Sequence, residues 1–221
     1  MEQRIDLHGE ALMAHMLGDL TAMRVADIGA GGGNASRMLS RLGAVVTGVE
    51  PQEEAVTAAR ALGGGPTYRV GSAEDTGLQE ARFDVVFFSF SLHHCDDPDA
   101  ALAEAHRILA PGGRICAMEP EALGPCHDVG APIDDETQVL ASAQAAMAQL
   151  APRARRTAHF RDKYYCGSGD ELIEKMVRVD PSRRVCAATR RGISDAFERL
   201  SDVDETGRYL EFYGRIDTLQ F

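Results

Sequence analysis

The sequence predicts an α/β fold, a doubly wound and mostly parallel sheet of seven strands with helices on both faces. From Met23 to Met118, short runs rich in β-branched residues alternate with stretches of helical periodicity, the pattern of parallel strands joined by crossover helices. The run from Phe83 to Phe90 is apolar at successive positions, as expected of a central strand that is covered on both faces. We therefore place the middle of the sheet at this run.

Five strands and three helices are predicted in this central region. The strands are Arg24–Ile28, Val45–Glu50, Thr67–Val70, Phe83–Phe90 and Gly113–Met118. The helices, which present apolar residues at helical spacing, are Ala35–Leu42, Glu53–Leu62 and Asp99–Leu109. Asp97 and Pro98 precede the last helix, and both residue types are common where a helix begins.

The flanking segments predict further elements. Leu7–Leu20 has the pattern of an amphipathic helix, and Asp135–Leu150 is an alanine-rich segment of high helix propensity. In the tail we expect strands near Ala158–Cys166 and Arg208–Gln220 and helices at Asp170–Val177 and Ile193–Ser201. The two tail strands bring the sheet to seven.

The length favours one domain. A chain of 221 residues with 44% hydrophobic residues can bury one sizeable core, and it contains no repeat or low-complexity linker. We expect residues 1–221 to form a single domain with a core at 20–120, while 1–20 and 120–221 cap the core and complete the sheet.

Charge and cysteine content narrow the function classes. The net charge of −11 disfavours binding to a nucleic-acid backbone, although residues 151–191 hold 11 Lys and Arg against 5 Asp and Glu, a net +6. That stretch is either an anion-facing surface or a solvated arginine-rich face.

Five cysteines without a C-x-x-C pair indicate reduced thiols. Because the chain shows neither a secretory pattern at its start nor an apolar run of roughly 18 residues, we expect a cytoplasmic protein that makes no membrane contact.

The segment from Val25 to Leu39 is the richest in chemical information. It reads as a strand, a glycine-dense turn and a helix, with glycine at 29, 31, 32 and 33. Glycines remove the Cβ atoms that would keep a ligand away from the backbone, and the free N–H groups of the following helix favour a partly anionic ligand. A tight strand-to-helix connection without a ligand is the alternative interpretation of this segment.

The spacing after this turn argues against a nicotinamide dinucleotide. The G-x-G-x-x-G pattern requires glycine at its sixth place, which is Asn34 when counted from Gly29 and Ser36 when counted from Gly31. Glu50, at the end of the next strand, can accept hydrogen bonds from both hydroxyls of a ribose. Glu50 therefore indicates a cofactor that contains adenosine, but it does not show which cofactor this is.

Five segments in this order resemble the class I S-adenosylmethionine (SAM)-dependent methyltransferases, in particular the small-molecule group that includes the ubiquinone and menaquinone biosynthesis enzymes. They are VADIGAGGG (25–33), VTGVEP (46–51), GSAED (71–75), FDVVFFSFSLHH (83–94) and HRILAPGGRI (106–115). The resemblance covers about 90 residues. It implies the Rossmann-like methyltransferase fold, SAM as the methyl donor and S-adenosylhomocysteine as the product.

The resemblance also implies roles for individual residues. Asp27, Gly29, Ala30 and Gly31 would hold the methionine portion of the cofactor, and Glu50 would hold the ribose. The residues implied at the adenine are Pro51, Ser72, Ala73 and Glu74, and those implied at the methionine end are Ser89, Phe90 and His94. Ser72 departs from the family, which often has Asp there. We expect a weaker adenine contact because a hydroxyl can still accept a hydrogen bond.

His93 and His94 are the candidate catalytic residues. Methyl transfer from a sulfonium is an in-line displacement, so the protein mainly aligns the nucleophile, and a base helps only when the acceptor must lose a proton. Either histidine could be that base. A packing role is the alternative, favoured for His94 and left open for His93. No metal site is expected, because adjacent histidines rarely converge on one ion.

The function predicted is methyl transfer from SAM to a small-molecule acceptor. The non-enzymatic alternative is a catalytically silent SAM-binding protein. The alternative enzyme is a nicotinamide-dependent oxidoreductase. The acceptor, the atom that is methylated and the oligomeric state do not follow from the sequence.

Overall fold

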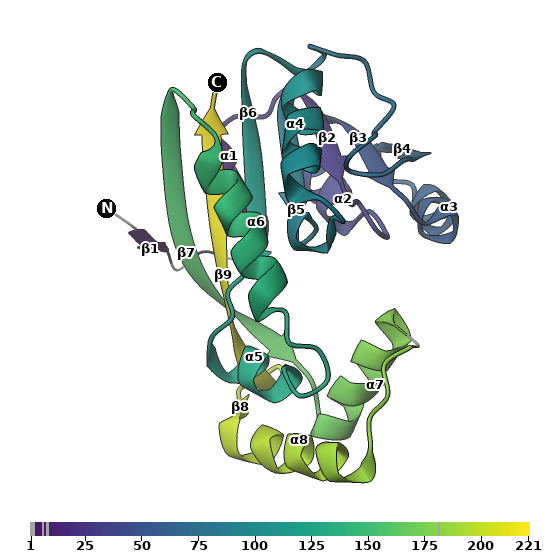
Figure 1. Cartoon of the computed structure of the whole chain (residues 1–221), viewed down its shortest axis with the longest axis vertical. Coiled ribbons are helices and arrows are strands. Elements are labelled where there is room, and N and C mark those ends of the chain that lie inside the picture. The colour runs from purple at the N-terminus through teal and green to yellow at the C-terminus, as the bar shows by residue number, and fades with distance from the viewer. Residues whose placement is uncertain (1–2, 6, 8, 181) are drawn as a thin grey trace. The chain divides into compact units, whose positions relative to one another are not determined.

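The computed structural model describes residues 3–5, 7, 9–180 and 182–221 (Figure 1). The strands are β1 (Gln3–Ile5), β2 (Arg24–Ile28), β3 (Val45–Glu50), β4 (Thr67–Val70), β5 (Phe83–Ser89), β6 (Leu109–Pro120), β7 (Ala154–Tyr165), β8 (Asp202–Val203) and β9 (Arg208–Gln220). The helices are α1 (Gly9–Leu17), α2 (Asn34–Arg41), α3 (Glu53–Leu62), the short 3₁₀ helix η1 (Leu92–His94), α4 (Pro98–Ile108), α5 (Gly124–Gly130), α6 (Thr137–Gln149), α7 (Gly169–Val179) and α8 (Ala187–Leu200).

The strands form one sheet in the order β1-β7-β9-β6-β5-β2-β3-β4, and β8 pairs with β9. The pairs β2–β3, β2–β5, β3–β4 and β5–β6 are parallel. The sequence order therefore reverses direction at β2, which lies between β3 and β5. In such sheets ligands bind beyond the carboxyl ends of the strands at this switch point. The predicted doubly wound fold is confirmed, with seven longer strands and the short β1 and β8 added.

The central strand β5 is buried on both faces, as its apolar run predicts. Val86 and Phe88 pack with α4 in one core cluster, while Val85 and Phe87 point to the opposite face and are also fully buried. Helix α2 contacts β2 and β3, α3 contacts β3 and β4, and α4 contacts β5. The sheet is thus covered by helices where the sequence analysis places its core.

Most predicted elements agree with the structure within two residues, and four differ more. Helix α1 ends at Leu17 instead of Leu20, and strand β7 begins at Ala154 instead of Ala158. Strand β6 begins at Leu109 instead of Gly113, because the segment Ala110–Gly113 is accommodated by an irregularity in the β5–β6 register. Helix α8 begins at Ala187 instead of Ile193, since the Cys186 side chain accepts the Thr189 N–H and caps a helix that includes Gly192. Helix α5 and the 3₁₀ helix η1 were not predicted.

The chain divides into two compact units. The first comprises Met1–Glu119, Ala141–Phe160 and Arg215–Phe221, and the second comprises Pro120–Leu140 and Arg161–Gly214. The first contains β2 to β5 and the predicted site residues. The second has its own apolar cluster, in which Leu172 and Ile173 of α7 pack with Ile193 and Phe197 of α8. Among the described residues, no helix has the length and apolar character required to cross a membrane.

Candidate functional site

The glycine turn after β2 leaves its backbone accessible. Gly29, Gly31 and Gly33 have φ angles of 73°, 51° and 79°, a left-handed conformation that side chains disfavour. The N–H groups of Gly29 and Ala30 donate to the Val49 carbonyl at 2.8 and 3.0 Å, which holds the turn against β3. A Cβ at Gly31 or Gly32 would meet no protein atom within 4 Å. The structure therefore has room for a ligand directly over this backbone.

Glu50 lies at the end of β3, beside the same turn. Its Oε2 accepts the Gly31 N–H at 2.9 Å and its Oε1 accepts the Gln52 N–H at 3.1 Å. Each carboxylate oxygen has a second acceptor position, so both can still accept hydroxyl donors. The side chain is 7% exposed. The structure thus holds a carboxylate at the position where the sequence analysis expects a ribose contact.

Asp27, at the base of the turn, is completely buried. Its Oδ2 accepts the Ser36 hydroxyl at 2.5 Å, while its Oδ1 has no hydrogen-bond partner in the described residues. Burial raises the pKa of this carboxyl to about 6, against the opposing effect of the Ser36 hydrogen bonds. A buried oxygen without a partner is costly, so this site favours a ligand that brings a donor or a positive charge.

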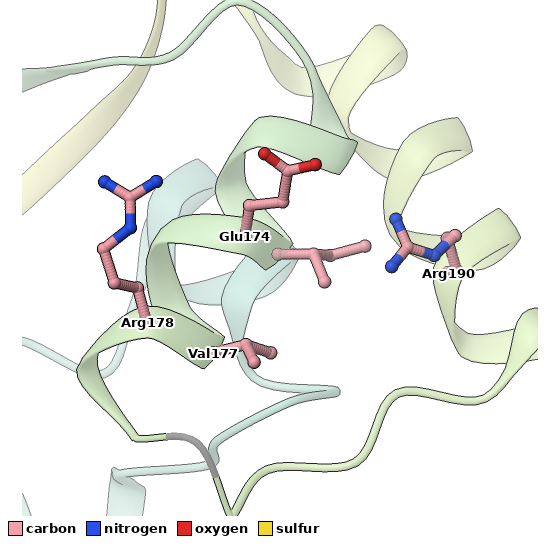
Figure 2. Close-up of a pocket in the computed structure, with 5 residues that line it drawn as sticks. Glu174, Val177, Arg178 and Arg190 are labelled. Carbon is pink, nitrogen blue, oxygen red and sulfur yellow. The ribbon is translucent and has the colours of Figure 1, made fainter.

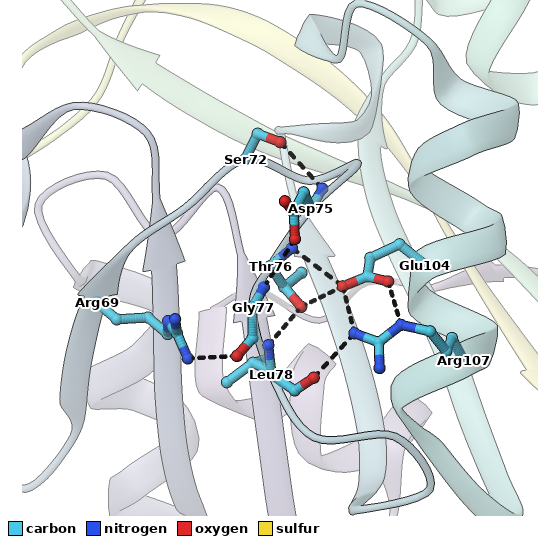
Figure 3. Close-up of polar contacts among 8 residues, drawn as sticks. All are labelled: Arg69, Ser72, Asp75, Thr76, Gly77, Leu78, Glu104 and Arg107. Atoms are coloured by element: carbon cyan, nitrogen blue, oxygen red, sulfur yellow. Dashed lines mark hydrogen bonds and ion pairs between the residues drawn. The ribbon is translucent and has the colours of Figure 1, made fainter.

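The loop after β4 contains Ser72, Ala73 and Glu74 and is held by polar contacts (Figure 3). The Ser72 hydroxyl accepts the Asp75 N–H at 3.0 Å. The buried Thr76 donates to Oε1 of Glu104 through both its N–H and its hydroxyl, at 3.0 and 2.5 Å. These contacts fix the loop conformation beside Ser72.

Glu104 lies on α4 and is itself held in place by Arg107. The Nε and Nη2 atoms of Arg107 lie 2.6 and 2.7 Å from the two Glu104 oxygens (Figure 3). The hydrogen bond from this guanidinium is the main reason that the pKa of Glu104 falls to about 2. The Gly71 N–H also donates to the Glu50 carbonyl at 3.2 Å. The loop is therefore anchored on one side to α4 and on the other to the end of β3.

The turn after β5 brings the next group of predicted residues to the glycine turn. The Ser91 hydroxyl donates to the Ile28 carbonyl at 2.6 Å, and a Cβ at Gly29 would overlap the Ser91 side chain. Phe90 has a φ of 54°, and its N–H donates to the Met118 carbonyl at 2.7 Å. A left-handed backbone conformation is unusual for an aromatic residue, and residues in such conformations cluster at functional sites. Ser89, at the end of β5, is half-buried.

The two histidines of η1 differ in their surroundings. His93 is buried and its Nδ1 contacts Oε2 of Glu119, whereas His94 is exposed and its N–H donates to the Ser91 carbonyl at 3.1 Å. The two rings lie 3.9 Å apart, centroid to centroid. The structure therefore distinguishes a buried histidine from an exposed one, whereas the sequence shows only two adjacent histidines.

These contacts bring most of the predicted residues together. Asp27, Gly29, Gly31 and Glu50 lie on adjoining strand ends, and the loops that carry Ser72 and Phe90 contact the same ends through Gly71 and Ser91. Pro51 is exposed next to Glu50, and the Glu74 carboxylate accepts the Asp97 N–H at 3.4 Å. Its predicted role at the adenine stays a prediction.

Three residues that position this site were not predicted. They are Ser36 against Asp27, Glu104 against Thr76, and Glu119 against the turn after β5. An acid at the carboxyl end of a central strand is the signal that could have identified Glu119.

The second unit contains a separate surface groove. It is lined by Ile173, Glu174, Val177, Arg178 and Arg190, with the charged side chains at its rim (Figure 2). Nη1 of Arg190 lies 2.6 Å from Oδ1 of Asp170. The ion pairs of Lys163, Lys175 and Arg183 with acids of the same unit likewise neutralise much of the basic stretch at 151–191. No predicted site residue lines this groove.

Residues 26–117, which carry the glycine turn, Glu50 and the turn after β5, match a family model described as a methyltransferase domain. Over these residues the chain is similar to class I SAM-dependent methyltransferases. A ubiquinone biosynthesis O-methyltransferase from Xanthomonas oryzae pv. oryzae is 39% identical to it over 102 residues, which are 44% of this chain and 43% of that protein.

A second relative is named for a different reaction, the methylation of carbon instead of oxygen. The ubiquinone/menaquinone biosynthesis C-methyltransferase of Rubrivivax gelatinosus is 33% identical over 96 residues, which are 43% of this chain and 38% of that protein. The chain thus matches less than half the length of either relative. The two names also differ in the methylated atom, so this similarity does not select oxygen or carbon.

Solved structures share the fold of this chain. The YcgJ protein of Bacillus subtilis has a TM-score of 0.63 and 20% identity, with 95% of this chain and 97% of that chain covered. The cyclase SpnF has a TM-score of 0.56 and 18% identity, with 99% and 87% covered. At this identity the likeness shows the fold alone. The SpnF example also illustrates that one fold hosts more than one reaction.

Proposed function

We propose that this protein transfers a methyl group from SAM to a small-molecule acceptor and releases S-adenosylhomocysteine. The observation that carries the proposal is the convergence of Asp27, Gly31 and Glu50 at the adjoining ends of β2 and β3, with open space over the glycine backbone. The buried Oδ1 of Asp27 without a partner fits the positively charged methionine end of SAM. These residues therefore fit the cofactor that the family uses.

Each residue has a physical task in this proposal. Glu50 accepts the ribose hydroxyls, Asp27 faces the methionine ammonium, and the Ser72 hydroxyl accepts from the adenine amino group. The sulfonium of bound SAM supplies an already activated methyl group. The protein contributes alignment and the exclusion of water, which supply most of the acceleration in such a displacement.

Further parts of the proposal concern the whole chain. We place the reaction in the cytoplasm, with a small molecule and not a nucleic acid as the acceptor. We also propose that residues 1–221 act as one methyltransferase domain. The topology supports this, because β7 and β9, which lie outside the 20–120 core in sequence, continue its sheet beyond β6.

A labelled-cofactor experiment tests the reaction. The chain is incubated with SAM carrying a tritiated methyl group and a cell extract separated into small-molecule, protein and nucleic-acid fractions. We expect label in the small-molecule fraction, and its loss with a Gly31→Val variant that fills the space over the turn. Label confined to protein or nucleic acid would show a different substrate class. Binding of S-adenosylhomocysteine without any transfer would indicate a silent binding protein.

A further inference from the structure

The surface groove of the second unit is formed by α7 and α8 (Figure 2). It is lined by Ile173, Glu174, Val177 and Arg178 of α7 and by Arg190 of α8, and its volume is about 340 Å³. All five residues belong to the second compact unit. Pockets that bind small molecules have volumes of about 300 to 1,000 Å³, so the groove has room for a small ligand.

The floor of the groove is apolar and well packed. Ile173 is 1% exposed and belongs to the apolar cluster that includes Ile193 and Phe197 of α8. Val177 packs against the same cluster and is half-buried. Because these contacts are present without a ligand, the floor is preformed. An apolar group placed on it would remove Val177 from water, which favours binding.

The rim of the groove holds charges of both signs. In the view of Figure 2, the Glu174 carboxylate lies between the guanidinium groups of Arg178 and Arg190. Glu174 and Arg178 are exposed, and within the described residues neither has an ion-pair or hydrogen-bond partner. Residues four apart on a helix are close enough to pair, yet these two side chains do not. One acid and one base of the rim are therefore both available to a ligand.

The second arginine of the rim is shared with an acid. Nη1 of Arg190 lies 2.6 Å from Oδ1 of Asp170, and the two side chains are 45% and 59% exposed. An ion pair as exposed as this one is weak, so Arg190 can also interact with a ligand. Two arginines and two acids thus stand at this rim, and their charges balance. The groove therefore lacks the net positive charge of the surrounding basic stretch at 151–191.

Charge complementarity selects the kind of ligand. A ligand with only an anionic group would bring that group close to Glu174, and a ligand with only a cationic group would bring it close to Arg178 and Arg190. A zwitterion finds an opposite charge for each of its groups. In an α-amino acid the ammonium and the carboxylate are attached to the same carbon atom, which matches an acid and a base one helical turn apart.

We propose that this groove is a binding site for a free α-amino acid with an apolar side chain. Glu174 accepts hydrogen bonds from the ammonium group, and Arg178 donates two parallel hydrogen bonds to the carboxylate, the geometry that a guanidinium group favours. The apolar side chain of the ligand covers Ile173 and Val177. The site shares no residue with the cofactor site proposed at the glycine turn, so it is an additional site of the protein.

Titration with L-leucine and two of its analogues tests the proposal on the full chain. One analogue, 4-methylpentanoate, lacks the ammonium group, and the other, 3-methylbutylamine, lacks the carboxylate. Binding is followed in two-dimensional ¹H–¹⁵N spectra up to tens of millimolar ligand. We expect leucine to cause saturable shifts of the amide signals of residues 173–178 and 190. Each analogue should bind about tenfold more weakly, because it forms hydrogen bonds with only one of the two charged partners.

Two variants identify the partner of each charged group of the ligand. Glu174→Gln should weaken leucine binding by about tenfold without weakening the binding of 4-methylpentanoate, which has no ammonium group. Arg178→Gln should weaken leucine binding to a similar extent without weakening the binding of 3-methylbutylamine. Both side chains are exposed, so the variants should fold. Glu205→Gln and Arg199→Gln, at exposed positions of the same unit outside the groove, are the matched controls and should bind leucine as the wild type does.

Three results would overturn the proposal. The first is the absence of saturable shifts at residues 173–178 and 190 with leucine at tens of millimolar. The second is equal binding of leucine and 4-methylpentanoate, which would show that the groove binds an apolar anion and does not recognise an ammonium group. The third is leucine binding that neither Glu174→Gln nor Arg178→Gln weakens, which would place the ligand outside the groove.

Discussion

Asp27 and Glu50, the two carboxylates beside the glycine turn, have opposite environments. Glu50 already receives two backbone N–H groups, whereas one oxygen of the buried Asp27 has no partner in the described residues. A carboxylate that is satisfied in the absence of ligand serves as a preformed acceptor. An unsatisfied one gains its partner when the ligand binds.

Glu50→Ala should weaken the binding of S-adenosylhomocysteine by tenfold or more. Hydrogen bonds to a carboxylate contribute on the order of 1.5 to 3 kcal/mol each, and the Gly31 N–H would lose its partner as well. Isothermal titration of the folded variant measures this, with the exposed Glu53→Ala as the matched control. An unchanged affinity in Glu50→Ala would remove Glu50 from the site.

Asp27→Asn should stabilise the protein at neutral pH in the absence of cofactor. Burial raises the folded-state pKa from 3.8 to about 6, so the folded state binds this proton more tightly than the unfolded state does. The resulting destabilisation is absent below about pH 4, grows between about pH 4 and 6, and levels off above that at no more than about 3 kcal/mol. Thermal unfolding from pH 4 to 8 should show a gain in Tm for Asp27→Asn that grows up to about pH 6 and then stays constant. A pH-independent difference would contradict this explanation.

At the scale of elements, the loop after β4 is held in place by residues of α4, a helix that follows it in the sequence. Glu104 of α4 accepts both donors of Thr76, and Arg107 donates to the Leu78 carbonyl at 2.8 Å (Figure 3). The loop that carries the residues proposed to address the adenine is therefore held in place by α4.

Glu104→Ala should loosen this loop. Thr76 would lose the acceptor for two buried donors, which costs about 1 to 3 kcal/mol for each unsatisfied group. We expect faster amide hydrogen exchange at residues 72–78 and several-fold weaker binding of S-adenosylhomocysteine. Glu80→Ala, an exposed acid just beyond the loop, is the control. Unchanged exchange at 72–78 would show that Glu104 does not hold the loop.

Sequence patterns predict the boundaries of some elements and miss those of others. β2, β3, β4 and α3 match their predicted ranges because their apolar periodicity and their breakers coincide. The start of β6 was missed because Pro111 and Gly112 read as a turn, although the sheet tolerates them as an irregularity. Ser36, Glu104 and Glu119 act on residues 9 to 28 positions away in sequence, and local patterns carry no signal for such contacts.

At the scale of the whole molecule, the proposal of one methyltransferase domain has a thermodynamic consequence. The β7 and β9 strands each contain residues of both compact units, so their backbone hydrogen bonds should be lost together. Differential scanning calorimetry should give one transition whose calorimetric and van't Hoff enthalpies agree. Two transitions, with only one shifted by S-adenosylhomocysteine, would show that the units unfold as separate domains.

The central claim, that the glycine turn and Glu50 form a SAM site, is tested most directly by isothermal titration with three ligands. The account predicts that S-adenosylhomocysteine binds in the micromolar range, while NAD and NADP show no binding, because Asn34 and Ser36 stand where the dinucleotide pattern requires glycine. Binding of NAD without binding of S-adenosylhomocysteine would contradict the account.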